Sequence, residues 1–267
     1  MSRTNESKVP VHTTNSVVKM QIKQILESYL HKYEIENCLN QIMDVISRSG
    51  TIKFEASNTK EPDFIPKDFS YFDGAISTKN YRIINKYKDI FTWVPGRTLE
   101  NGIVVNGFYV SSYEISQTTV LKENYSKDAG ILQSLEGKLP LTCTPAWEFR
   151  CKRRHFHGTL ISNDQYDAIC EMFAEEVGYV AVYKDSTNIG NYSKKYTKTG
   201  THVIRGISNM TGNTYTITND TNAEGNIIVR GGSYIDNGYK YPMAHTSSIE
   251  PDFCTELHGF RMVISQE

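Results

Sequence analysis

The sequence Val229-Arg230-Gly231-Gly232-Ser233-Tyr234 has the composition of a buried strand that ends in a tight turn. Aliphatic residues at 227–229 lead into it, and β-branched side chains favour a half-buried, pleated strand. Gly231 and Gly232 have no Cβ atom, so the backbone there can adopt a positive φ or approach another segment closely. We therefore predict a strand before residue 231 and a turn directly after it.

A second strand of this kind is expected near the C-terminus, in the sequence His258-Gly259-Phe260-Arg261-Met262-Val263. Its apolar residues again suit a half-buried strand, and Gly259 permits a close approach of the backbone. The segment between the two strands, Tyr234–Leu257, holds few aliphatic residues and many Tyr, Asp, Asn, His, Ser and Thr. This composition is typical of a binding surface rather than of a core.

The Arg-Gly-Gly-Ser sequence at 230–233, followed about 25 residues later by Gly-Phe-Arg at 259–261, resembles a known family signature. It is similar to the C-terminal part of the formylglycine-generating-enzyme type of C-type-lectin-like fold. Residues 104–115, which contain Tyr113-Glu114-Ile115, resemble the family's first strand with its Tyr-Glu-Val motif, and residues 160–169 resemble the beginning of its middle helix. The resemblance implies an α+β fold with short strands, two helices and long loops.

Three groups of proteins share that fold: sulfatase-activating enzymes, variable proteins of diversity-generating retroelements, and phage tail or fibre proteins. The enzymes hold a copper ion through two cysteines, whose places correspond to Asp236 and Tyr241 in this chain. Cu(I) is a soft ion that needs thiolate ligands, and a carboxylate and a phenol do not replace them. We therefore expect a protein that is not an enzyme and has no metal and no cofactor.

In the retroelement variable proteins, the segment between the two strands carries the residues that contact the ligand. A cluster of Tyr with short polar side chains suits adaptable contacts to a protein or a glycan. The resemblance implies the following contact residues here: Tyr234, Asp236, Asn237, Tyr239, Tyr241, Met243, His245 and Ser247. The alternative is that this segment packs against a neighbouring subunit and has only a structural part.

Composition narrows the class of protein further. The 29 basic and 30 acidic residues leave a formal net charge of −1, whereas a nucleic-acid binder would show a basic excess. The five cysteines are odd in number and lack Cys-x-x-Cys spacing, so we expect no disulfide framework and a reducing site of synthesis. The N-terminal residues lack the apolar core of a signal peptide, and no apolar run is as long as a membrane span.

The sequence predicts three regions along the chain. In residues 1–50, apolar residues recur in steps of three and four, which predicts a helical segment that either oligomerises or packs on its own domain. Residues 51–90 are punctuated by proline and are expected to be a linker with short strands. Residues 91–267 are expected to form the C-type-lectin-like domain, with helices over 146–154 and 164–176.

Other possible sites are weaker. His155 and His157 lie near Cys151 and Cys143, but their spacing matches no zinc pattern, and neighbouring basic residues would repel a cation. Glu250-Pro251-Asp252 is similar to the calcium-binding tripeptide of sugar-binding lectins, yet the companion Trp-Asn-Asp motif is missing. No Gly-x-Ser-x-Gly nucleophile elbow occurs.

These observations favour a phage virion protein, a tail or head fibre or adhesin, made in the host cytoplasm. We expect its partners to be a host cell-surface protein or glycan, other virion proteins, and further copies of itself, with a trimer favoured. No nucleic acid and no membrane insertion are expected. Two alternatives remain, a purely structural assembly subunit and an enzyme of the formylglycine-generating type that uses different ligands.

Overall fold

The computed structural model describes residues 60–72, 81–118, 131–148, 158–190, 198–200 and 202–266. All of them belong to one compact unit, Thr59–Glu267. The helical segment expected over residues 1–50 therefore lies outside the described residues. Among the described helices, none combines the length and the hydropathy that a membrane crossing requires.

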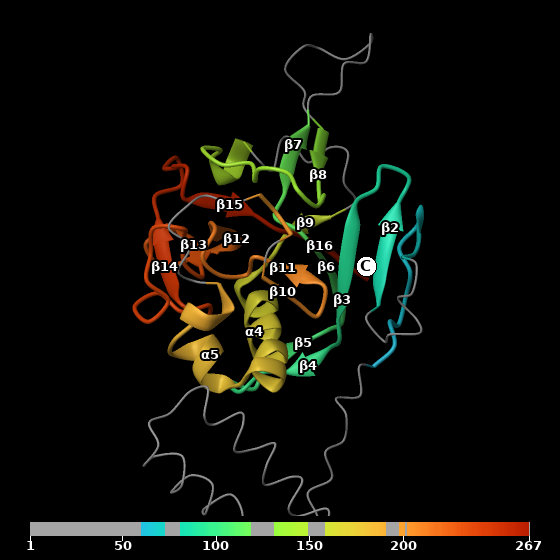
Figure 1. Ribbon diagram of the computed structural model, residues 1–267, viewed down its shortest axis with the longest axis horizontal. Helices are drawn as coiled ribbons and strands as arrows, with labels where there is room; N and C mark the ends of the chain where they lie inside the picture. Colours follow the sequence, from blue (N-terminus) through green and yellow to red (C-terminus); the bar gives the residue numbers. More distant parts are fainter. Residues whose placement is uncertain are drawn as a thin grey trace, which may run out of the picture. The chain divides into compact units, whose positions relative to one another are not determined.

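Six strands form the larger of the two main sheets of this unit, and each neighbouring pair in it is antiparallel (Figure 1). In order across the sheet they are β1 (Phe69–Tyr71), β2 (Arg82–Asn85), β3 (Ile90–Val94), β6 (Phe108–Ser111), β16 (Met262–Ser265) and β9 (Thr159–Leu160). The last strand of the chain thus lies between two earlier ones. The position of β16 between β6 and β9 joins the N-terminal and C-terminal parts of the unit in one sheet.

Side chains on the central strands alternate between two hydrophobic clusters, as the two-residue period of a strand requires. Val94 of β3 and Val263 of β16 belong to one cluster, together with the buried face of a helix. Their neighbours Trp93 and Met262 belong to the other cluster, together with residues of the second sheet. The central strands of the large sheet are therefore buried by different parts of the chain on their two faces.

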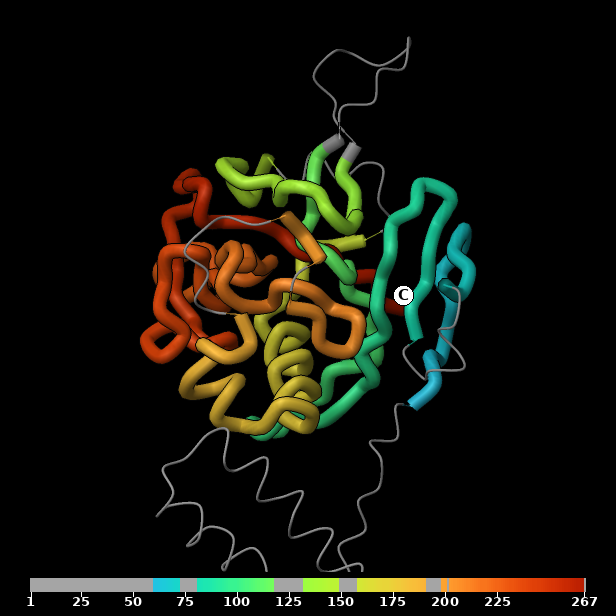
Figure 2. Tube along the Cα trace, viewed as in Figure 1, coloured from blue at the N-terminus to red at the C-terminus, as the bar shows by residue number. Residues whose placement is uncertain are grey.

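The second main sheet has four strands. In order they are β14 (Thr246–Ile249), β13 (Ile227–Arg230), β12 (Tyr215–Thr221) and β15 (His258–Phe260). β12 and β15 run parallel and the other pairs are antiparallel. Figure 2 shows these orange and red segments gathered at one side of the unit, away from the cyan and teal strands β1–β3.

The C-terminal strand expected over 258–263 is divided in the structure. Residues 258–260 form β15 in the small sheet and residues 262–265 form β16 in the large sheet, with Arg261 between them. The chain thus passes from one sheet to the other at Arg261. The first strand expected from the family resemblance is divided as well, into β5 (Val104–Val105) and β6.

The helix expected over 164–176 is confirmed as α4 (Asn163–Val177). Ser162 accepts a hydrogen bond from the backbone N of Gln165, and the Gln165 side chain accepts one from the backbone N of Ser162, which makes a capping box. The apolar stripe expected on this helix is buried: Tyr166, Ile169, Cys170 and Phe173. Of the helix expected over 146–154, residues 146–148 are helical and the remainder lies outside the described residues.

Shorter elements complete the unit. Three two-stranded sheets pair β4 (Arg97–Thr98) with β5, β7 (Ser116–Thr118) with β8 (Ile131–Gln133), and β10 (Val203–Ile204) with β11 (Ile207–Ser208). A second α-helix, α5 (Tyr179–Tyr183), follows α4 directly, and a 3-10 turn, η2 (Thr187–Ile189), comes after it. Long connections join these elements, as the resemblance implies.

The large sheet begins earlier in the chain than the sequence analysis places it. Within the expected linker 51–90, β1 pairs with β2, and β2 pairs with β3. The residues before β1 are also attached, because Trp93 Nε1 donates to the Lys60 carbonyl at 2.9 Å and the Tyr109 hydroxyl donates to the Phe64 carbonyl at 3.0 Å. The described part of 60–90 is therefore an integral part of the sheet, and the boundary at residue 91 is corrected accordingly.

Candidate functional site

Arg230, at the end of β13, fixes this strand to the N-terminal part of helix α4. Its side chain is 2% exposed, and its Nη1 donates to Asn163 Oδ1 at 2.6 Å while its Nη2 donates to Asp167 Oδ1 at 2.5 Å. The guanidinium also lies over the ring of Tyr166, 4.7 Å from the ring centre, which is a cation–π arrangement. A buried arginine with these partners holds strand and helix in one relative position.

Gly231 is the residue at which the chain leaves this strand. Its φ is 77°, and its backbone N donates to the His245 carbonyl at 2.9 Å. A Cβ atom placed here would come within 2.9 Å of the Tyr166 hydroxyl, which donates to the Met210 and Met243 carbonyls. Both the positive φ and the lack of space require glycine, as the sequence predicts.

A second buried arginine, Arg261, lies where the chain passes between the sheets. It is fully buried, and its Nη1 donates to the Ser111 carbonyl at 3.1 Å while its Nη2 donates to the Ser208 carbonyl. Its charge interacts with that of Glu114, whose side chain is 1% exposed. The Gly-Phe-Arg motif and the Tyr-Glu-Ile motif therefore meet in the interior through opposite charges.

The Glu114 carboxylate accepts three hydrogen bonds in addition. Asn213 Nδ2 and Thr214 Oγ1 each donate to it at 2.6 Å, and Asn209 Nδ2 donates at 3.4 Å. Burial raises the pKa of Glu114, and the charge of Arg261 and these hydrogen bonds act against that shift. We call Glu114, Arg261 and these three donors the Glu114–Arg261 network; it holds residues 209–214 against the two motifs.

On this framework, segment 234–257 exposes part of the predicted contact residues. Tyr239 is 74% exposed, and Asn237 is exposed beside it in a turn where Asn237 Oδ1 accepts from the Tyr239 backbone N at 2.8 Å. Ser247 is exposed on β14, an edge strand of the small sheet. These three side chains are free to contact a partner.

Three other predicted contact residues are half-buried. The Tyr234 hydroxyl donates to Glu256 Oε1 at 2.8 Å, which ties the two ends of the segment together. Tyr241 packs with its ring edge to the His245 ring, 4.9 Å between centres. Burial lowers the pKa of His245, so its imidazole is neutral near pH 7. Each of the three residues is still partly exposed to solvent.

Asp236, by contrast, is occupied by its own turn. Its Oδ2 accepts from the Ser233 backbone N at 2.8 Å and from Ser233 Oγ at 2.5 Å, and the Tyr215 hydroxyl also bonds to this carboxylate. With Tyr241 turned to His245, neither position offers the soft thiolate that copper requires. Nor does any group of three His, Cys, Asp or Glu side chains suited to a metal occur among the described residues. The copper ion of the sulfatase-activating enzymes therefore does not fit the residues at 236 and 241.

Met243 is the one predicted contact residue that the structure removes from the surface. Its side chain is 0% exposed and belongs to the hydrophobic cluster that includes α4. Its backbone N donates to Ser186 Oγ at 2.7 Å, which draws the middle of the segment into the interior. The prediction for Met243 is therefore wrong, and the residue anchors the segment to the framework instead.

Two exposed apolar residues of the same segment were missed by the sequence analysis. Ile235 is 63% exposed and Phe253 is 49% exposed. Each stands beside a turn-forming polar residue, and exposed apolar side chains in such places are a signal for an interaction surface. With Tyr239 they give the segment three large side chains that solvent reaches.

The possible calcium tripeptide lies on the surface as well. Glu250, Pro251 and Asp252 are exposed, and the Glu250 carbonyl accepts from the Phe253 backbone N at 3.0 Å, which closes a turn. The tripeptide is thus a turn. Of the possible zinc cluster, Cys143 is described, whereas Cys151, His155 and His157 lie outside the described residues.

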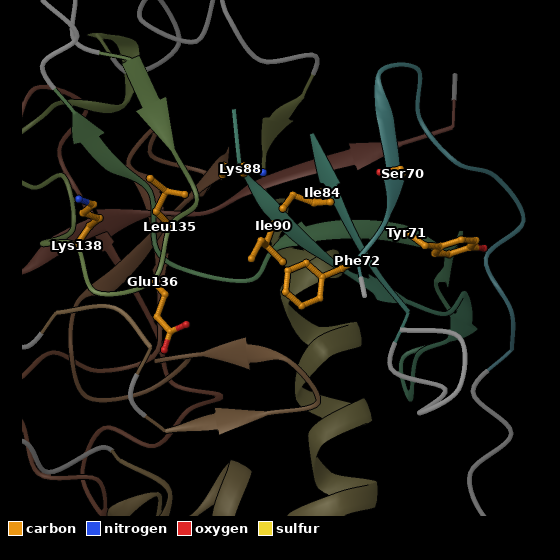
Figure 3. Close-up of a pocket in the computed structure, with 9 residues that line it drawn as sticks. All are labelled: Ser70, Tyr71, Phe72, Ile84, Lys88, Ile90, Leu135, Glu136 and Lys138. Carbon is orange, nitrogen blue, oxygen red and sulfur yellow. The ribbon is translucent and has the colours of Figure 1, made fainter. Parts of the chain in front are cut away.

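A concavity of about 680 Å³ is lined by residues on and between β1, β2 and β3 and by residues of the segment 135–138 (Figure 3). Ile84 and Ile90 are cross-strand partners there and, with Phe72, form its apolar floor. Its charged residues, Lys88, Glu136 and Lys138, are exposed to solvent. The groove shares no residue with segment 234–257, and no buried polar group marks it as a ligand site.

The chain is similar in structure to three solved proteins of the formylglycine-generating-enzyme and C-type-lectin-like kind. CarF has 14% identity and a TM-score of 0.44, with 66% of this chain and 97% of CarF covered. PvdO from Pseudomonas aeruginosa has 12% identity and a TM-score of 0.43, with 67% and 95% covered. The U1 variant of the Major Tropism Determinant has 11% identity and a TM-score of 0.38, with 66% and 62% covered.

The fold class expected from the sequence, α+β with many short strands and few helices, is confirmed. No protein-family model matches the sequence, and no curated protein matches it either. At 11–14% identity, no residue role is carried over from the three solved proteins.

Proposed function

We propose that this protein is a non-catalytic recognition protein of a phage virion, a tail or head fibre or adhesin. In this proposal, segment 234–257 contacts a protein or glycan on the host surface. The proposal rests on one contrast in exposure. The two arginines that fix the framework are buried, whereas Tyr239 of segment 234–257 is 74% exposed. A rigid base with large exposed side chains is the arrangement of a binding surface.

The chemistry of the segment supports binding rather than catalysis. Tyr supplies a large contact area with few rotatable bonds, so little conformational entropy is lost when it is buried against a partner. Asn237 and Ser247 add short polar groups that can donate and accept hydrogen bonds. The two positions that would hold copper in the enzymes carry Asp236, which is hydrogen-bonded to Ser233, and Tyr241, which packs on His245.

The first test is binding of the purified protein to intact cells of the bacterium that the source phage infects. We expect saturable binding, and we expect the double substitution Tyr239→Ala and Tyr241→Ala to weaken it by about 30-fold or more. Truncating a Tyr at the centre of an interface costs at least about 2 kcal/mol, and each 1.4 kcal/mol is a factor of ten. The apparent dissociation constant on cells, measured with fluorescently labelled protein, checks this.

The matched control is Tyr87→Ala, because Tyr87 is also an exposed tyrosine, at 47%, but lies in the turn between β2 and β3. We expect this variant to bind as the unchanged protein does, and all variants to keep the same melting temperature within a few degrees. Equal binding by the double variant and the unchanged protein would contradict the proposal. So would an equal loss with Tyr87→Ala.

A structural assembly subunit is the second candidate, favoured by the exposure of Ile235 and Phe253. Apolar side chains this exposed are often buried between subunits in an oligomer, for which we favour a trimer. Light scattering of the protein with Ile235→Ser and Phe253→Ser distinguishes the two candidates. Loss of the oligomer with this pair favours the structural role, whereas an unchanged mass with weaker binding to cells favours recognition.

A further inference from the structure

Cys143 and Cys254 are about 110 residues apart in the sequence, but their segments lie side by side in the fold. The backbone N of Cys143 donates to the Thr255 carbonyl at 3.1 Å. Both thiols are free, with Cys143 exposed and Cys254 half-buried. The charge of the Cys143 thiol also contributes to the raised pKa of Cys254. Counting the cysteines could not find this pair, because it is formed by a contact that is distant in the sequence.

The backbone at Cys143 has a φ of 53°, in the left-handed region that residues with a side chain seldom adopt. The hydrogen bond to Thr255 holds this conformation against the loop at 250–257. The Cys143 thiol lies close enough to the Tyr234 phenol to interact with it as well. Cys254 belongs to segment 234–257, and Cys143 lies beside the surface that this segment forms.

We propose that Cys143 and Cys254 form an intramolecular disulfide when the protein meets a low-molecular-weight disulfide. The exposed Cys143 thiolate attacks one sulfur of that molecule, which gives a mixed disulfide at Cys143 and releases one thiolate. The Cys254 thiolate then attacks the Cys143 sulfur and releases the second thiolate. Two protein thiols lose two protons and two electrons, and the small disulfide is reduced to two thiols.

Cys143 reacts first because its thiol is exposed, whereas that of Cys254 is half-buried. Burial raises the pKa of the Cys254 thiol, and the neighbouring Cys143 and Glu148 raise it further. Cys254 is therefore less often a thiolate near pH 7, and the second step becomes faster as the pH rises. The bond would join the loop at 141–145 to the loop at 250–257 and restrict the motion of both beside Tyr234. Formation of this disulfide does not depend on whether segment 234–257 binds a partner.

The test uses the full-length protein and oxidised glutathione, followed by alkylation of free thiols and peptide mapping without reduction. We expect one peptide pair joined through Cys143 and Cys254, and a melting temperature higher by roughly 5–10 °C that dithiothreitol returns to its first value. Cys254→Ser should stop at a glutathione adduct on Cys143. Cys143→Ser should leave the Cys254 thiol free to be alkylated.

Three results would overturn the proposal. The first is a lasting glutathione adduct on Cys143 in the unchanged protein while Cys254 remains alkylated, as in the Cys254→Ser variant. The second is a disulfide through Cys143 that joins two chains. The third is no reaction of Cys143 under conditions in which a model thiol is fully oxidised. Peptide mapping separates all three from any bond made by Cys38 or Cys151.

Discussion

Replacing Arg261 with Met is expected to lower the free energy of unfolding by about 3–5 kcal/mol, because it leaves a buried carboxylate without its opposite charge. The Ser111 and Ser208 carbonyls lose their donors at the same time. Total stabilities of single domains are about 5–15 kcal/mol, so the variant would keep only a fraction of its stability. Urea unfolding followed by tryptophan fluorescence measures the change.

The effect of Arg261→Met should also depend on pH. Without the arginine, the pKa of Glu114 rises further above its value in the unfolded chain, so the folded variant binds a proton more readily. Stability from a group with a raised pKa is present at low pH and is lost as the pH rises through the folded pKa. The loss in the free energy of unfolding caused by Arg261→Met should therefore be smaller at about pH 5 than at about pH 8.

Glu176→Gln is the matched control, because it breaks an ion pair at the surface instead. Arg205 Nε and Glu176 Oε2 are 2.8 Å apart, but the Glu176 side chain is 49% exposed. We expect a loss below about 1 kcal/mol for this variant. A loss of that size for Arg261→Met as well, with no dependence on pH, would mean that the Glu114–Arg261 network does not hold the two motifs together.

Gly259→Ala is expected to be the other strongly destabilising change, at about 2.5–6 kcal/mol. A Cβ atom at Gly259 would lie 2.4 Å from Thr214 Oγ1 and 3.1 Å from Thr214 Cβ, so Thr214 must move. Thr214 Oγ1 donates to Glu114 Oε1 at 2.6 Å, and the movement would break that bond. Overpacking costs about 1–3 kcal/mol, and a hydrogen bond to a charged group is worth about 1.5–3 kcal/mol.

Gly225→Ala is the control for Gly259→Ala, because it tests the cost of an unfavourable backbone conformation without any crowding. Gly225 has a φ of 84° and nothing within 4 Å of the place of a Cβ atom, so only the backbone penalty of about 1–2 kcal/mol applies.

Adding Thr214→Ala to Gly259→Ala should cost less than the sum of the two single changes, because the clash and the hydrogen bond disappear together. Strict additivity in urea unfolding would contradict the proposed link between Gly259 and Glu114.

The sequence predicts well those features that local patterns determine. The apolar spacing and the capping residues of 162–177 indicate α4, and the glycine at 231 indicates the turn after β13, because both depend on residues close in the chain. The family resemblance identifies Glu114, Arg230 and Arg261 as members of motifs. It does not reveal that the two arginines hold those motifs in the interior.

Contacts between distant residues account for the misses. Residues 51–90 are expected to be a linker with short strands, because a strand's partner is not visible in its own sequence. In the structure β1 pairs with β2, and β2 pairs with β3 of the large sheet. Met243 stands in a polar segment, but its backbone bonds to Ser186, which lies beyond α5, and this contact buries it. The proximity of Cys143 and Cys254 arises in the same way.

The most direct measurement is adsorption of phage that carry Tyr239→Ala and Tyr241→Ala to cells of their host. Immunoblots of purified virions first establish that the variant protein is incorporated in the normal amount. We expect the adsorption rate then to fall by about tenfold or more, while phage with Tyr87→Ala adsorb normally. Virions that contain the double variant and adsorb at the unchanged rate would show that this segment is not the surface that recognises the host.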